Sequence, residues 1–150
     1  KKIDPSVPLP RVDGYQVQVL SGRRILDLAG DAFAINPDST LKPEDVQLLA
    51  VARHEGEDRF VAYWGFRTVG DDLLDWGLHV APEHRSRGLT KALFAAAFAG
   101  APGNGWVYTG TDFFNLSARR TMSGLNLQPF QLRVSLQTLG GLRVVRQWRL

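Results

Sequence analysis

The segment from His79 to Leu93 holds the residues whose types and order best predict binding chemistry. A predicted strand ends at Val80, and a basic loop with Arg85 and Arg87 then leads into a predicted helix that begins at Gly88. The first turn of a helix presents unpaired backbone N–H groups and the positive end of the helix dipole. Glycine has no Cβ, so an anion can approach the backbone closely. This order of residues predicts a cradle for a diphosphate, built mainly from main-chain donors.

The same segment also has a simpler interpretation. A solvated basic turn that only caps a helix would show the same residues, because arginine and glycine are common at helix starts. Two other phosphate motifs are absent from the chain: the Gly-x-x-x-x-Gly-Lys loop and the Gly-x-Gly-x-x-Gly dinucleotide run. The residue types alone therefore leave the anion cradle and the plain helix cap both open.

The spacing in this segment resembles that of a known family. Arg85-x-x-Gly88-x-Thr90, behind a strand that ends Val80-x-Pro82, resembles the acyl-CoA signature of the GNAT superfamily of N-acyltransferases. That signature is Arg/Gln-x-x-Gly-x-Gly/Ala after a strand ending Val-x-Pro. The sequence departs from it at Thr90, where the family has a small residue, but the backbone N–H of a threonine is still available.

A later segment carries a second, weaker match. Asn115-x-x-Ala118, a short predicted helix and Leu125-Asn126-Leu127 resemble the family's Asn-x-x-Ala/Met…Leu-Gly-Phe segment. Asn126 replaces the glycine, and asparagine can also adopt the left-handed conformation that ends a helix. The order of the two matches along the chain is the family's order.

The resemblance implies acetyl-CoA as the co-substrate, bound between two splayed central strands at 73–80 and 106–111. The main chain of Leu78 and Val80 would pair with the pantetheine amides, and Asn115 would contact the pantetheine arm. The residues implied around the diphosphate, on the loop and the first helical turn, are Arg85, Ser86, Arg87, Gly88, Leu89, Thr90 and Lys91.

The chemistry implied by the resemblance is direct attack of a primary amine on the thioester. The N–H of Val80 would stabilise the oxyanion. Asp75 and Asp112 are both candidates for the general base, and strand parity counts against Asp75. Family members often carry an acid tyrosine where this chain has Met122, which cannot donate a proton. A thiolate with a pKa around 8.5 can depart without that acid.

Other chemistry is restricted by composition. The chain has no cysteine, which removes a cysteinyl intermediate and a thiolate metal site. No histidine and carboxylate set has metal-ligand spacing, so no metal site is expected. His79 lies among apolar residues and is expected to be a hydrogen-bonded structural histidine, whereas His54 and His84 lie in predicted loops with no partner pattern. A non-catalytic acyl-CoA-binding module is the alternative function, kept open by Met122 and the uncertain base.

Hydrophobic periodicity predicts the elements that position this segment. These elements indicate a mixed α/β fold, and the family resemblance implies a GNAT-like mixed sheet, mostly antiparallel, of about seven strands with helices on both faces. The extended N-terminal arm is expected at 1–14 and a single domain at 15–150. The predicted elements begin with a strand at 15–19, a helix capped by Ser21 and a short second helix starting at 43–45. They continue with a hairpin at 46–53 and 60–66, a strand at 73–80, a helix at 88–101, a strand at 106–111, a helix at 116–125 and strands at 130–136 and 142–148.

The composition is that of an ordinary globular protein. The 150 residues are 44% hydrophobic and 22% charged, and the net charge of +3 is too small to argue for a nucleic-acid partner. No segment has the length of a membrane helix, and the absence of cysteine fits a cytoplasmic protein. The last predicted strand, 142–148, could pair with a second copy in a homodimer.

Overall fold

The computed structural model describes residues 2, 10–111, 114–127, 129, 131–137 and 143–149. Their contacts form two compact units, Lys1–Asp112 and Phe113–Leu150. Of the predicted N-terminal arm, residues 1 and 3–9 lie outside the described residues, and Lys2 forms an isolated β-bridge with Trp106. The single domain from residue 15 to 150 stays a prediction.

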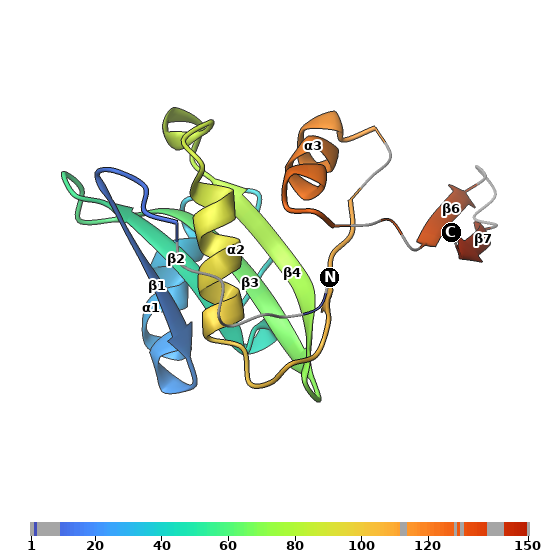
Figure 1. The fold of residues 1–150 in the computed structure, drawn as a ribbon, viewed down its shortest axis with the longest axis horizontal. Coiled ribbons are helices and arrows are strands. Elements are labelled where there is room, and N and C mark those ends of the chain that lie inside the picture. Colours follow the sequence, from blue (N-terminus) through green and yellow to red (C-terminus); the bar gives the residue numbers. More distant parts are fainter. Residues whose placement is uncertain are drawn as a thin grey trace. The chain divides into compact units, whose positions relative to one another are not determined.

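The first unit is built on one five-stranded sheet with the spatial order β1-β2-β3-β4-β5 (Figure 1). Neighbouring strands are antiparallel, except for the parallel pair β4 and β5. The expected strand at 106–111 is much shorter than predicted. The strands are β1 Tyr15–Ser21, β2 Leu48–His54, β3 Phe60–Val69, β4 Asp72–Val80 and β5 Val107–Tyr108.

Two helices cover opposite faces of this sheet: α1, Arg23–Phe33, and α2, Leu89–Ala99 (Figure 1). Tyr63 belongs to the core cluster under α1, whereas its neighbour Trp64 packs against Phe94 of α2. Successive residues of a strand point to opposite faces. Because both faces are covered, β2 and β3 are buried along most of their length. The expected helices on both faces are therefore present.

The start of α1 differs from the prediction. The residue that caps it is Gly22, at φ +55°, and not Ser21, which is the last residue of β1. No side chain caps this helix start. Glycine is suited to the position because a positive φ is strained for residues with a Cβ.

Strand β4 contains an irregularity at its centre. Gly65 pairs with Gly77, but the next residue, Phe66, pairs with Asp75, so Trp76 is one residue extra. Such a bulge bends a strand and increases its twist. The pairing of β4 with β5 ends at the same place, since it involves only residues 73 and 74 of β4. Among the described residues, the edge of β4 beyond residue 74 therefore has no strand partner on the β5 side.

The second unit contains helix α3, Leu116–Gly124, and the antiparallel pair β6, Gln131–Gln137, and β7, Arg143–Arg149. These two strands form their own two-stranded sheet. The expected single sheet of about seven strands is therefore not confirmed. Two short 3-10 helices, η1 at Pro43–Asp45 and η2 at Pro82–His84, complete the described elements.

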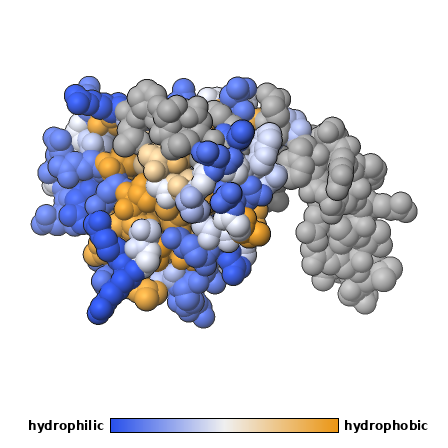
Figure 2. Space-filling view, turned by 60° about the horizontal axis from the view of Figure 1, so that its bottom comes forward, coloured by the Kyte–Doolittle hydropathy of each residue, from blue (hydrophilic) through white to orange (hydrophobic). Residues whose placement is uncertain are grey.

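The surface carries both hydrophilic and apolar areas. In one space-filling view an apolar area lies in the middle of the coloured surface, bordered by hydrophilic residues (Figure 2). None of the helices in the described ranges has the length and apolar composition needed to cross a bilayer.

Candidate functional site

The loop between β4 and α2 forms an open set of backbone donors. Gly88 is the N-cap of α2 at φ +82°, and Ser86 also has a positive φ of 61°. The backbone N–H groups of residues 86–90 pair with no acceptor among the described residues. A Cβ placed on Gly88 would meet nothing within 4 Å, so the helix start faces open space. Free N–H groups at an open helix N-terminus favour an anion.

Not every residue predicted for the cradle takes part in the same way. The N–H of Lys91 donates to the carbonyl of Gly88 over 3.0 Å, so it belongs to the helix and is not free for a ligand. The Arg85 Nε donates to the Val80 carbonyl over 3.0 Å, which folds that side chain back onto the end of β4. Arg87 makes only a long contact of 3.5 Å to the Glu83 carbonyl. Arg87 is therefore the arginine that is freer to meet an anion.

The unpaired edge of β4 presents the main chain of Leu78 and Val80. The N–H of Ala81 donates to the Val61 carbonyl on β3, over 2.9 Å. In an antiparallel pair, residues alternate between bonding the partner strand and facing away from it. Val80 and Leu78 therefore direct their N–H and C=O groups away from β3, toward the side where β5 has separated. Both residues lie where a ligand could pair as an added strand, although the Val80 carbonyl is already engaged by Arg85.

Asp75, a candidate base, has both carboxylate oxygens in use. Its Oδ1 accepts from Trp64 Nε1 over 2.9 Å and from the N–H of Gly77 over 3.0 Å. Its Oδ2 accepts from the Thr109 hydroxyl, just beyond β5. Burial raises the pKa of Asp75, and these three hydrogen bonds act in the opposite direction. The carboxylate ties the bulge of β4 to the chain leaving β5, so its geometry is that of a structural anchor.

Three further predicted positions are either not described or lie in the second unit. Asp112, the other candidate base, is not among the described residues. Asn115 lies in the second unit, where its side chain accepts from the N–H of Ala118 over 3.0 Å and caps α3. Met122 lies within α3. The roles of Asp112 and Asn115 stay predictions.

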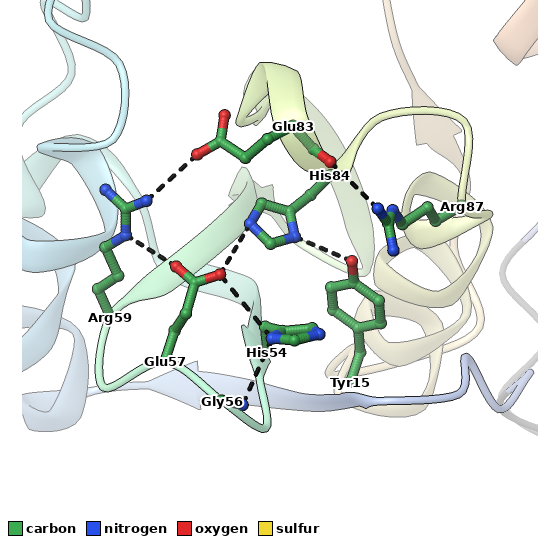
Figure 3. Close-up of polar contacts among 8 residues, drawn as sticks. All are labelled: Tyr15, His54, Gly56, Glu57, Arg59, Glu83, His84 and Arg87. Carbon is green, nitrogen blue, oxygen red and sulfur yellow. Dashed lines mark hydrogen bonds and ion pairs between the residues drawn. The ribbon is translucent and has the colours of Figure 1, made fainter.

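A polar cluster lies directly before the cradle, around His84 (Figure 3). His84 ends η2 and is only 6% exposed. Its Nδ1 lies 2.9 Å from the Tyr15 hydroxyl, and its Nε2 lies 3.0 Å from Glu57 Oε1. Which of the Tyr15 hydroxyl and Nδ1 donates in their hydrogen bond depends on the tautomer of the ring. The Nε2 contact has ion-pair distance but lacks hydrogen-bond geometry.

Arginine and glutamate extend this cluster. Arg59 Nε donates to Glu57 Oε2 over 2.9 Å, and Arg59 Nη2 donates to Glu83 Oε1 over 3.2 Å. The hydrogen bond from Arg59 holds the pKa of Glu57 below its ordinary value. The sequence showed no partner pattern for His84, and the structure supplies partners from distant segments. Its partners come from the start of β1 and the β2–β3 turn, and no local spacing could have indicated them.

His79 is the other histidine near the site. Its ring stacks on Tyr63, with ring centroids 6.1 Å apart, on the α1 face of the sheet. Its Nε2 is buried and has no hydrogen-bond partner among the described residues, contrary to the expected hydrogen-bonded histidine. Burial lowers the pKa of His79, and the charge of Arg85 adds to the effect. The imidazole is therefore neutral near pH 7.

Metal ligands do not cluster in the part of the chain that the structure describes: no group of three or more His, Asp or Glu side chains there could hold an ion.

The candidate site of the first unit combines an open helix start, a β4 edge without a strand partner among the described residues, and a bulge held by Asp75. Together these features suit a ligand that carries both anionic and amide groups.

Comparison with known proteins decides the family. The acetyltransferase (GNAT) family matches residues 24–124, which spans α1 through α3. The chain belongs to this family. Among proteins of curated function, none matches this GNAT sequence closely enough to count as a relative.

Solved structures share the GNAT fold at low identity. An aminoglycoside acetyltransferase from an uncultured soil metagenomic sample has a TM-score of 0.60 at 17% identity, covering 83% of this chain and 98% of its own. The ribosomal-protein-S18-alanine N-acetyltransferase from Escherichia coli has a TM-score of 0.58 at 12% identity, covering 90% and 93%. The aminoglycoside N-acetyltransferase AAC(6')-Iy, solved with CoA, has a TM-score of 0.58 at 15% identity, covering 75% and 91%. At these identities the likeness establishes a shared fold.

Proposed function

We propose that this GNAT protein is an N-acetyltransferase that moves an acetyl group from acetyl-CoA to a primary amine. The observation that carries the proposal is the row of unpaired N–H groups at residues 86–90, with Gly88 open to solvent in the middle. Backbone donors at a helix start suit the diphosphate of coenzyme A. The structural neighbour solved with CoA supports the choice of this cofactor.

The free edge of β4 would hold the pantetheine arm. Leu78 and Val80 direct their main-chain groups to the side left open when β5 separates from β4. A pantetheine amide that pairs there would act as an added strand. Pairing with the Val80 carbonyl would require Arg85 to release it, whereas the N–H of Val80 has no acceptor in the part of the chain that the structure describes.

The reaction would proceed in one ternary complex. The amine nitrogen attacks the thioester carbonyl, the C–N bond forms, and the N–H of Val80 stabilises the oxyanion. The C–S bond then breaks, the electron pair leaves with the thiolate of CoA, and the ammonium proton passes to a base. Asp112 remains the candidate for that base, because the oxygens of Asp75 already accept from three donors.

A binding module that holds acyl-CoA without turnover is the second candidate. The specific observation in its favour is that both carboxylate oxygens of Asp75, one of the two predicted bases, already accept hydrogen bonds. Met122 in α3, at the position matched to the family's tyrosine, adds to it. Binding and turnover must therefore be measured separately.

Binding is tested by the change Gly88→Leu, with Gly22→Leu as the matched control. Both glycines are N-caps of helices at positive φ, and both have open space around the missing Cβ. Each change should cost about 1–2 kcal/mol in the free energy of unfolding, because a side chain is strained there. Only Gly88→Leu should abolish CoA binding in calorimetry. Equal CoA affinity in the two variants would contradict the cradle.

Turnover is tested by the release of free CoA thiol from acetyl-CoA in the presence of amines. The panel should include aminoglycosides and peptides with an N-terminal alanine, since structural neighbours are named for these acceptors. Polyamines and aryl amines complete it. Thiol release that depends on one amine class would support the enzyme. Tight CoA binding with no release across the panel would favour the binding module.

A further inference from the structure

Strand β4 carries three titratable side chains, and two of them are already bonded. Asp72 accepts from the N–H of Trp106 over 2.7 Å, and Asp75 accepts from three donors. His79 has no hydrogen-bond partner for either ring nitrogen among the described residues; its Nε2 is buried, whereas its Nδ1 is not. A buried polar atom without a partner is uncommon in a folded protein. His79 is therefore the titratable group of β4 whose role the structure leaves open.

His79 lies on the α1 face of the sheet, and α1 and α2 cover opposite faces (Figure 1). It pairs with Tyr63 of β3, and residues paired across antiparallel strands present their side chains on the same face. The two rings stack, and Tyr63 belongs to the core cluster under α1. Asp75 is on the other face, because it bonds the Trp64 ring, which packs against Phe94 of α2. The α1 face of β4 thus has an unbonded imidazole and not a carboxylate.

A segment between α1 and β2 lies over the same part of β4. The Tyr63 hydroxyl donates to Ser39 Oγ over 3.3 Å, and the same oxygen accepts from the N–H of Leu41 over 3.3 Å. A Cβ built on Gly77 would lie 2.7 Å from Leu41 Cδ1, so Leu41 lies directly over Gly77. The ring of His79, two residues further along β4, is therefore close to residues 39–41 and has a defined position near the open edge of the strand.

This position places an imidazole beside the atoms of the proposed reaction. Val80, whose N–H is the proposed oxyanion donor, is the next residue, and successive residues are about 3.3 Å apart along a strand. Main-chain groups bond within the plane of the sheet, whereas side chains stand roughly perpendicular to it. A thioester at the edge of β4 would thus have the His79 ring on its α1 side. A general base must reach the proton directly or through one water, and His79 meets this condition.

The surroundings keep the His79 imidazole unprotonated near pH 7. Burial lowers its pKa, and the charge of Arg85 adds to the effect. The other titratable group in contact with the ring is Tyr63, whose hydroxyl is engaged with Ser39. Only an unprotonated imidazole has a nitrogen that accepts a proton, so His79 is available as a base at this pH.

We propose that His79 is the general base of the transfer and that its Nδ1 takes the proton from the attacking amine. The inference rests on the proposed function, because it requires acetyl-CoA to be paired along β4. As the C–N bond forms, the amine nitrogen becomes positively charged and gives one proton to Nδ1. The C–S bond then breaks, the electron pair leaves with the sulfur of CoA, and the imidazolium returns its proton to the solvent. His79 thereby fills the role for which the sequence offers Asp75 and Asp112.

The test measures the release of CoA thiol from acetyl-CoA by the wild type and two variants. The acceptors are a peptide that begins with alanine and hydroxylamine, which is small and needs no acceptor pocket. His79→Gln keeps a polar side chain without a basic nitrogen, so it should lower kcat by about 10²-fold or more and leave the KM for acetyl-CoA unchanged. His54 is the matched histidine, at the end of β2 and separated from β4 by β3. His54→Gln should leave kcat unchanged.

Two readouts separate catalysis by His79 from a structural role. The kcat of the wild type should rise with pH through the pKa of His79, which is below the ordinary value of 6.5, and should then level off. This step should be absent in His79→Gln. In His79→Ala, added imidazole should restore part of kcat, and more basic imidazoles should restore more of it. A step that moves with the pKa of the amine, or a rescue that does not depend on basicity, would overturn the inference.

The two proposals fail in different ways. If the wild type releases thiol with either amine and His79→Gln keeps its kcat, the proposed function stands and the assignment of His79 falls. A loss of kcat in Asp112→Asn and not in His79→Gln has the same meaning. If the wild type binds CoA but releases no thiol with either amine, the transferase and the inference fall together. Calorimetry should give His79→Gln the CoA affinity of the wild type; weaker binding would place His79 in coenzyme binding and overturn its role as the base.

Discussion

At the scale of single residues, His84 shows how a buried polar group can position a binding loop. Its ring contacts Tyr15 on one side and Glu57 on the other, and it is almost fully buried at 6% exposure. Burying an imidazole without partners is unfavourable, so these contacts determine where η2 can lie. Because the cradle follows η2 directly, the contacts of His84 also determine where the N–H groups of residues 86–90 are presented.

The change His84→Phe should weaken both folding and CoA binding. It leaves the Tyr15 hydroxyl and the Glu57 carboxylate without their shared partner, which should lower the free energy of unfolding by about 1–3 kcal/mol. His84→Gln keeps a polar group and should restore part of both losses. The measurements are urea denaturation and calorimetry with CoA. A His84→Phe variant that loses stability but binds CoA normally would contradict the positioning role.

His79 gives a prediction about pH. Burial lowers its pKa in the folded protein, so the unfolded chain takes up the proton first as the pH falls through about 6.5. The contribution of neutral His79 to the free energy of unfolding is thus fully present above about pH 6.5, and it is lost as the pH falls toward the pKa of the folded state. His79→Leu removes this titration. The unfolding free energy of the wild type should therefore fall more steeply between pH 7.5 and 5 than that of His79→Leu; parallel profiles would contradict it.

At the scale of elements, the bulge of β4 is the feature on which the proposed site depends. The extra residue, Trp76, lies where β4 and β5 stop pairing, and Asp75 bridges the two sides of that point. A carboxylate is well suited to this position because it can accept from a ring N–H, a backbone N–H and a hydroxyl together. The separation of the strands, which would admit the pantetheine arm, is therefore fixed by a side chain.

Two substitutions separate anchoring by Asp75 from catalysis. Asp75→Asn keeps an acceptor for Trp64 and Gly77 and can donate to the Thr109 hydroxyl, but it cannot take up a proton as a base. Its kcat should stay within about threefold of the wild type, whereas loss of a general base costs about 10²–10⁴-fold. Asp75→Ala should lower the unfolding free energy by about 1–3 kcal/mol. A collapse of kcat in Asp75→Asn would reinstate Asp75 as the base.

At the scale of the whole molecule, the net charge is small, but positive side chains gather where the ligand would lie. The net charge is only +3, yet Arg11, Arg87 and Lys91 line one hollow beside the open helix start. Local cations of this kind raise the concentration of a polyanionic ligand near its site. The sheet behind them is covered on both faces, so the site is carried by a rigid core.

Salt should therefore weaken CoA binding. These charges are near solvent, where the screening length is about 10 Å at 0.1 M salt and about 3 Å at 1 M. The dissociation constant for CoA should rise several-fold between 0.05 and 0.5 M NaCl, measured by calorimetry. Pantetheine, which lacks the phosphates, serves as the control ligand, and its weaker binding should change little. An equal effect of salt on both ligands would contradict an electrostatic site.

The sequence by itself determined the features that depend on local order. Gly88 and the apolar helix after it follow from residue type and spacing, as do the hairpin of β2 and β3 and the adjacent β4, because periodicity and turn residues act over a few positions. The family resemblance rested on two short segments, 79–93 and 115–127, and was confirmed.

Only the tertiary structure decided the features that join distant residues. Tyr15 and His84 are 69 residues apart, and Asp75 and Thr109 are 34 apart, so no periodic pattern could relate them. The bulge at Trp76, the hydrogen bond from Arg85 to the Val80 carbonyl and the presence of Arg11 and Gly88 on one hollow likewise arise when strands pair and helices pack. A side chain's partners depend on which surfaces the core brings together, and that is a property of the folded chain.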